Sequence, residues 1–242
     1  NGNNKSWSVT SIPIQGNVAL KDFCWLDSTL ASTKTFLNID ALIDGNESKL
    51  NIDRLLIQSE KNDLFVDIAG HAEKDKYGYT SFLANINKIQ IEGNAFSEFI
   101  LLPHLDSTIT NHLYRLGGID LKGAIEKTNE NTTLKGNIDT ECGEIDIHIA
   151  SAPNKIISGE LKTNKFNIGQ LLDSEKLGYT SFYIKGTGIE EINTNSNESI
   201  IGNIEGKIND FEYSGYKYTG IGVNAFSDID GIGGEVIVND EN

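Results

Sequence analysis

The ten residues Ile200–Asn209, with the sequence IIGNIEGKIN, decide the fold expected for this chain. Apolar and polar residues alternate along them with a period of two, the period at which the side chains of a β-strand point to opposite faces of a sheet. One side carries Ile200, Gly202, Ile204, Gly206 and Ile208, and the other carries Asn203, Glu205, Lys207 and Asn209. The stretch therefore predicts a strand with one apolar face and one solvated face.

The same alternation recurs along the chain. Gly143–Ser151 sets Ile145, Ile147 and Ile149 against Glu144, Asp146 and His148, and Leu64, Val66 and Ile68 alternate with Phe65, Asp67 and Ala69. Further strands are expected over 134–138, 156–161, 182–184 and 235–238. Turn-forming residues at 127–131 and 152–154 separate neighbours by short reversals. About ten strands in an antiparallel meander follow from this spacing.

One interior segment has the period of a helix. Leu102, Leu105, Ile109, Leu113 and Leu116 recur every three or four residues. Pro103 suits the first turn of a helix, and Gly117-Gly118 suit its end. A helical insertion is therefore expected over about 97–116, and Phe166–Leu172 predicts a second, single helical turn.

Internal repetition supports one β-rich unit used several times. The pentapeptide GYTSF occurs at Gly78–Phe82 and at Gly178–Phe182, and a looser copy stands at Gly215–Thr219. Repeat-like units are expected at about 64–96, 119–188 and 199–242. No linker rich in proline, glycine and serine divides the chain. Residues 1–242 are therefore expected to form a single segment.

Composition excludes some partners. The net charge of −15 argues against nucleic acid, which needs a basic surface, and against docking on an anionic membrane surface. No apolar run of transmembrane length occurs. Cys24 and Cys142 lie far apart in the sequence, and a free buried thiol at each position is preferred to a disulfide between them.

Sequence signatures of catalysis are missing. The spacings that define serine hydrolases, P-loops, dinucleotide turns and zinc proteases do not occur. The four histidines, at 71, 104, 112 and 148, lack ligand-like spacing, and Asp228–Gly231 lacks the further ligands of a calcium loop. We therefore expect no catalytic residue, no cofactor and no metal, and we expect a protein that is not an enzyme.

Several short segments in the second half carry a family resemblance. They are Phe166–Leu172, Leu177-Gly178, Ile184–Gly188, Gly206–Asn209, Tyr213–Tyr218 and Gly231–Asn242. Their order and their glycine and hydrophobe pattern resemble the TamB (translocation and assembly module) branch of the AsmA-like proteins, as found in Bacteroides-like bacteria. The resemblance extends from about Ile119 to Asn242.

The resemblance implies an elongated, curved antiparallel sheet shaped as a trough or taco-like groove with an apolar inside. It implies a long periplasmic protein of the cell envelope, anchored in the inner membrane by an N-terminal helix. Members of the family are implicated in phospholipid transport to the outer membrane and in outer-membrane biogenesis with a barrel assembly factor. The present chain lacks the anchor and the region that meets this factor, so a soluble middle piece of a longer protein is expected.

The alternation of apolar and polar residues is compatible with two interpretations. An antiparallel sheet with one apolar face must cover it with a second sheet, a helix or a ligand. If the face lines a groove, a phospholipid acyl chain lying there gains about 0.8 kcal/mol for each buried CH₂. The expected groove lining is Ile145, Ile147, Ile149, Phe182, Ile184, Ile200, Ile204, Ile208, Val236 and Val238.

The other reading is that these residues fill a closed core, as in most proteins with alternating strands. A surface adhesin or carbohydrate-binding β-sandwich is the alternative function that such a core would favour. Its exposed aromatic residues would be Tyr77, Tyr79, Tyr179, Tyr216 and Tyr218.

Overall fold

A computed structural model gives the structure of the chain. It describes residues 7–25, 28–95, 107–152, 156–192, 198–228 and 231–240. The chain divides into two compact units, Asn1–Asn129 and Glu130–Asn242, which are described separately. The division lies within the repeat-like unit expected over 119–188, next to the turn-forming residues 127–131.

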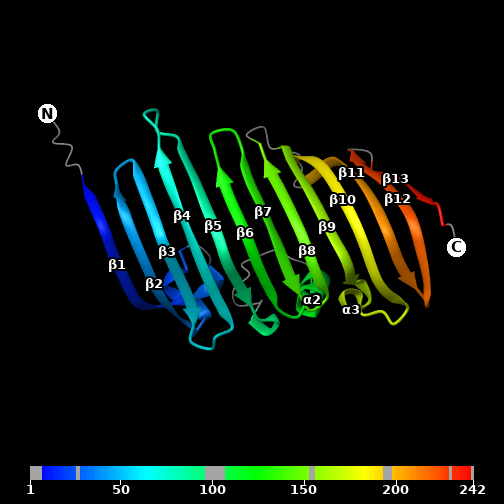
Figure 1. The fold of residues 1–242 in the computed structure, drawn as a ribbon, viewed down its shortest axis with the longest axis horizontal. Coiled ribbons are helices and arrows are strands. Elements are labelled where there is room, and N and C mark those ends of the chain that lie inside the picture. The colour runs from blue at the N-terminus through cyan, green and yellow to red at the C-terminus, as the bar shows by residue number, and fades with distance from the viewer. Residues whose placement is uncertain are drawn as a thin grey trace. The chain divides into compact units, whose positions relative to one another are not determined.

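The described residues of the first unit form six strands, each paired antiparallel with the next one along the chain (Figure 1). They are β1 (Ser8–Ala19), β2 (Phe36–Asn46), β3 (Lys49–Ser59), β4 (Leu64–Lys74), β5 (Thr80–Ile91) and β6 (Ile119–Lys127). The described helices of this unit are the 3₁₀ turns η1 (Leu20–Phe23), η2 (Ser28–Ser32) and η3 (Gly93–Ala95) and the helix α2 (Ser107–Arg115).

A small hydrophobic core holds one end of this sheet. Leu20 and Leu30, from the two 3₁₀ turns between β1 and β2, pack with Leu37 and Leu64 of the strands. The partly buried residues around them are Phe23, Ile57, Val66 and Ile91. The chain between β1 and β2 therefore folds back over the apolar side of the sheet at this end.

Seven strands are described in the second unit, and each again pairs with its neighbour along the chain. They are β7 (Thr132–Thr140), β8 (Gly143–Ser151), β9 (Ile156–Asn167), β10 (Leu177–Ile192), β11 (Glu198–Tyr213), β12 (Tyr216–Asp228) and β13 (Gly231–Val238). The short helix α3 (Ile168–Leu172) follows β9, and the side-chain oxygen of Asn167 caps it by accepting from the Gln170 N–H at 3.0 Å.

Local sequence explains the tightest hairpin. Ser214 and Gly215 join β11 to β12 with φ of 50° and 79°. Two consecutive residues with positive φ form the two-residue turn whose twist matches that of a hairpin. Tyr213 therefore pairs directly with Tyr216, and the register of both long strands is fixed from this end.

The predicted class, a mainly β chain built on curved antiparallel sheet, is confirmed. The strands of each unit bend along their length (Figure 1). Among the described residues, no strand pairing closes either sheet into a barrel and no second sheet packs against it. Thirteen strands are described, three more than the approximate number expected.

Individual helices and strands agree with the sequence predictions to different degrees. Strand β8 has the expected bounds, and α3 is the expected single turn. Helix α2 covers the end of the expected insertion, whereas residues 97–106 lie outside the described part of the chain. The polar stretch Asn193–Asn197 also lies outside it. Among the described helices, none has the length and apolar character needed to cross a membrane.

Neither cysteine is disulfide-bonded. Cys142 is buried, as expected for a thiol. Cys24 is exposed, which corrects the expectation that both thiols are buried. It lies just after η1, at the surface of the first unit.

Candidate functional site

The pairing register of the second unit aligns the expected groove residues on one face of its sheet. Directly opposite residues in antiparallel strands share a face. From β7 to β13, one row across the sheet reads Ile138, Ile145, Thr163, Phe182, Ile208, Ile221 and Val238. The next reads Gly136, Ile147, Leu161, Ile184, Gly206, Val223 and Val236.

Two more rows continue this side, which we call the apolar face. The third reads Leu134, Ile149, Gly159, Gly186, Ile204, Ala225 and Gly234, and the fourth, from β8, reads Ser151, Ile157, Gly188, Gly202, Ser227 and Ile232. None of these four rows contains a charged residue. From Phe182 onward the register of β10 with its neighbours has no bulge or shift, and the shifts in β10 all precede Phe182, so the apolar face is continuous across seven strands.

Nine of the ten expected lining residues belong to the apolar face. The tenth, Ile200, lies in β11 opposite Glu190, and its side chain is outside the described part of the structure. The sequence interpretation missed several other members of the face, namely Leu134, Ile138, Ile157, Leu161, Ile221, Val223 and Ile232. Alternation in Tyr216–Asp228 was a usable signal for two of them, Ile221 and Val223.

Exposure along the apolar face changes from one end of the strands to the other. Ile147 and Ile221 are each 8% exposed, whereas Ile204 is 48% exposed. At the far end and on the last strand, Val236 and Ile232 reach 65% and 86%. Large apolar side chains on this face are therefore only partly covered by the protein itself.

Glycines leave part of the apolar face without side chains. Gly159 lies opposite Gly186, and Gly188 lies opposite Gly202. A Cβ at Gly159 would have its nearest neighbour, the His148 carbonyl oxygen, at 3.8 Å, an ordinary van der Waals contact, so crowding does not require glycine there. A Cβ at Gly202 would lie 2.3 Å from the Thr187 carbonyl oxygen, so the close approach of β10 to β11 requires glycine at that position.

The opposite face of the same sheet is charged and wet. One of its rows runs from His148 through Glu160 and Lys185 to Glu205. The Lys185 Nζ lies 2.9 Å from the Glu205 Oε2, and the hydrogen bond to Glu205 raises the pKa of Lys185. These side chains border a shallow depression of about 210 Å³. Alternation has thus placed charged side chains on the face opposite the apolar one, where the exposed residues Ile189, Phe226 and Ile237 also lie.

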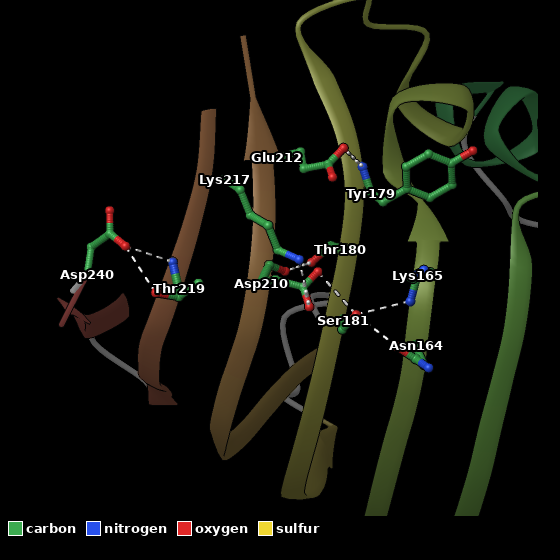
Figure 2. A network of polar contacts seen from close by, with 10 residues as sticks. All are labelled: Asn164, Lys165, Tyr179, Thr180, Ser181, Asp210, Glu212, Lys217, Thr219 and Asp240. Carbon is green, nitrogen blue, oxygen red and sulfur yellow. Dashed lines mark hydrogen bonds and ion pairs between the residues drawn. The ribbon is translucent and has the colours of Figure 1, made fainter. Parts of the chain in front are cut away.

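Polar contacts join neighbouring strands near Ser181 of β10 (Figure 2). A bulge at Ser181 and Phe182 of β10 brings the buried Ser181 hydroxyl between three strands. Its Oγ accepts from the Lys165 N–H at 3.0 Å and lies within donating distance of the Asp210 Oδ1 (3.2 Å) and the Asn164 Oδ1 (3.3 Å).

Further polar contacts lie on both sides of this serine and on the last strands of the unit. The Thr180 hydroxyl donates to the Asp210 carbonyl oxygen at 3.0 Å, and the Thr219 hydroxyl donates to the Asp240 Oδ1 at 3.0 Å. The Tyr179 N–H donates to the Glu212 Oε2 at 3.2 Å (Figure 2). The bonds of Ser181, Thr180 and Tyr179 join the ends of β9, β10 and β11, and the Thr219 bond joins β12 to the residues that follow β13.

No group of three or more His, Cys, Asp or Glu side chains is placed to hold a metal ion in the described ranges. At the turn after β12, the Asp228 Oδ1 accepts from the Gly231 N–H at 3.1 Å, the contact of an ordinary polar turn. The apolar face is therefore the candidate site of this chain.

Comparisons with known proteins found no matching family model, no matching curated protein and no matching solved structure. The resemblance to the TamB branch stays a prediction.

Proposed function

We propose that the second unit offers its apolar face to the acyl chains of phospholipids. The chain then acts as a non-enzymatic periplasmic segment of a TamB-like envelope protein that is anchored in the inner membrane. That protein moves phospholipid to the outer membrane and supports outer-membrane assembly with a barrel assembly factor, through regions outside residues 1–242. The observation that carries the proposal is the unbroken, uncharged register of the apolar face across seven strands.

The dimensions of the face suit a lipid tail. Seven strands about 4.8 Å apart make a surface about 29 Å wide. The hydrocarbon core of a bilayer is about 30 Å thick, so one acyl chain needs about half this width. Each CH₂ removed from water contributes about 0.8 kcal/mol. A single acyl chain can therefore gain several kcal/mol without a specific contact.

Partial exposure favours a ligand over a closed core. Ile149, Ile157, Leu161, Ile204, Ile232, Val236 and Val238 are exposed on this one face. Monomeric proteins rarely leave contiguous apolar patches larger than a few hundred Å² uncovered. A face with this composition is expected to be covered by a molecule that is itself apolar.

The adhesin or carbohydrate-binding sandwich has less support. A sandwich requires two packed sheets, whereas each unit contains one open sheet among its described residues. The rings of Tyr216 and Tyr218 lie edge to face with centroids 4.6 Å apart, and the Tyr216 hydroxyl donates to the Asp240 Oδ2. These two tyrosines therefore serve the fold of the last strands.

A matched pair of substitutions tests the proposal. Ile204→Asp places a carboxylate on the apolar face, and Ile189→Asp places the same group on the opposite face at a residue of similar exposure, 42% against 48%. The assay is binding of a pyrene-labelled phosphatidylethanolamine, together with native mass spectrometry of lipid that copurifies.

The expected result is a loss of binding of about tenfold or more for Ile204→Asp, because an acyl chain on the face would bury the charge. Ile189→Asp should bind as the unmodified chain does. Absence of bound phospholipid in the unmodified chain, or equal binding by both variants, refutes the proposal. Ile147 is a poorer test position, because it is buried and a charge there would disturb folding.

A further inference from the structure

A step in side-chain length creates the depression on the face opposite the apolar face. Two neighbouring rows of residues, each running from β8 to β11, line it. The floor row is Ala150, Ser158, Thr187 and Asn203, and the wall row is His148, Glu160, Lys185 and Glu205. Short side chains in the floor row lie beside long ones in the wall row, which leaves a hollow of about 210 Å³.

The depression gathers many hydrogen-bonding groups in a small space. The Thr187 hydroxyl donates to the Asn203 Oδ1, and the Ser158 hydroxyl belongs to the same row. An asparagine NH₂ group can donate two hydrogen bonds, and a hydroxyl can both donate and accept. The carboxylates of Glu160 and Glu205 add acceptors beside them. A ligand with several neighbouring groups that donate and accept hydrogen bonds matches this set.

Charge narrows the class of ligand. Two carboxylates, Glu160 and Glu205, and one ammonium group, Lys185, border the depression. Lys185 is already paired with Glu205 at 2.9 Å. A phosphate or carboxylate ligand would therefore meet an excess of negative charge, on a chain whose net charge is −15. Lys185 in turn disfavours a second cation, so the matching ligand is uncharged.

An exposed aromatic ring continues the floor row. Phe226 of β12 lies directly opposite Asn203 and is 53% exposed. A Cβ at Gly233, the residue of β13 opposite Phe226, would lie 2.5 Å from the ring atom Cζ, so the ring extends over Gly233. Glycine at this position lets the ring lie across the sheet, and it leaves an apolar surface beside the hydrogen-bonding groups.

We propose that this depression binds one uncharged pyranose ring of a carbohydrate. A pyranose has the matching form, with C–H groups on its faces and hydroxyls around its rim. The hydroxyls bond to Asn203, Glu160 and Glu205, and one C–H face lies against the ring of Phe226. The volume of about 210 Å³ is below the range of about 300–1,000 Å³ that is typical of pockets for drug-sized ligands, so the hollow has room for a single ring.

The first test is saturation-transfer difference NMR with four neutral sugars. They are methyl glucoside, methyl galactoside, methyl mannoside and N-acetylglucosamine. At least one should bind with a Kd on the order of 1 mM, because a ligand of about a dozen non-hydrogen atoms gains little per atom in a shallow site. Methyl glucuronide carries a carboxylate and should bind more weakly than each neutral sugar that binds.

The second test removes the aromatic surface. Phe226→Leu keeps an apolar side chain over Gly233 and should weaken binding of the sugar about fivefold, whereas Phe226→Tyr should retain binding. Ile237→Ala is the control, because Ile237 is an exposed apolar residue on the same face, 44% against 53% exposed, and lies outside the depression. The upfield shift of the sugar C–H protons caused by the phenyl ring should disappear only in Phe226→Leu.

The third test removes a donor. Asn203→Ala should weaken binding about fivefold, the effect of one hydrogen bond. Asn209→Ala makes the same change on the same face of the same strand, six residues further along, and should bind as the unmodified chain does. Both asparagines are exposed, so neither change disturbs packing. Far-UV circular dichroism checks the folding of each variant.

The sugar site and the lipid face are tested independently. Ile204→Asp, on the apolar face, should leave sugar binding unchanged, and Phe226→Leu should leave phospholipid binding unchanged. Three outcomes overturn the proposal of a sugar site. They are no saturation transfer to any of the four neutral sugars, binding of methyl glucuronide that is tighter than theirs, and equal effects of the site variants and their controls.

Discussion

Removing the hydroxyl of Ser181 is expected to destabilise the second unit by about 1.5 kcal/mol. Ser181 is 4% exposed, and its Oγ accepts a hydrogen bond from the Lys165 N–H at 3.0 Å. Ser181→Ala deletes this acceptor, and it also deletes the donor that faces Asp210 at 3.2 Å. Leaving one partly buried backbone donor unsatisfied costs about 1–3 kcal/mol, and the lower half of that range applies because Lys165 lies near the surface.

The chain provides an internal control for this change. Ser81 occupies the same place in the first copy of the pentapeptide GYTSF, but its Oγ reaches only the Glu73 carbonyl oxygen, at 3.5 Å. Ser81→Ala should therefore cost less than about 0.5 kcal/mol. Urea-dependent hydrogen exchange of peptides from β9 to β11 measures the second unit, while fluorescence of Trp7 and Trp25 follows the first. Equal effects of the two substitutions would refute the assignment of the Ser181 network.

Two further predictions concern single groups. Iodoacetamide should modify Cys24 in the folded chain and Cys142 only after denaturation. Cys142 is buried, and its burial, together with the charge of Glu141, raises the pKa of its thiol. Equal labelling rates of the two cysteines, measured by mass spectrometry, would contradict this prediction. Asp240→Asn should lower the pKa of Tyr216 toward its ordinary value, because the 2.7 Å hydrogen bond to Asp240 and burial both raise it. Since the pKa of Tyr216 is raised in the folded chain, its contribution to stability is complete below the ordinary tyrosine pKa and is lost as the pH rises through the folded value. The pKa is measured by ¹³C NMR titration of labelled tyrosine. If the contact with Asp240 is not formed, Asp240→Asn should leave the pKa of Tyr216 unchanged.

Strands with strict alternation were predictable from the sequence. Gly143–Ser151 and Ile200–Asn209 keep a period of two throughout, and both lie in strands. The strands of the first unit are interrupted in phase. In β3, the pairing shifts between Ile52 and Leu55, so apolar residues change from even to odd positions within one strand. A bulge of this kind hides the period of two from any reading of the sequence alone.

The membership of the apolar face was partly predictable, but its openness was not. Odd or even position along a strand tells which of its residues share a side of the sheet. The pairing register of β8 to β10 is needed in addition to show that Ile145, Ile147 and Ile149 share a face with Phe182 and Ile184. The same alternation fits a closed sandwich and an open sheet, because both put every second residue inside. What covers the face is a tertiary property, and no residue pattern within a strand encodes it.

The two units illustrate this difference. In the first, η1 and η2 bring Leu20 and Leu30 onto the strands, so part of the apolar side becomes a core. In the second, the described chain covers Ile147 and Ile221 at one end and leaves Ile204 and Ile232 largely in water. A half-exposed isoleucine adds little to folding, because burial is the source of its stabilisation. Ile204→Asp should therefore leave the urea midpoint of the second unit nearly unchanged while it removes phospholipid, whereas at a core position the same change would unfold the unit. A parallel loss of stability and binding would mean that Ile204 belongs to a core, and that the apolar face needs no ligand to cover it.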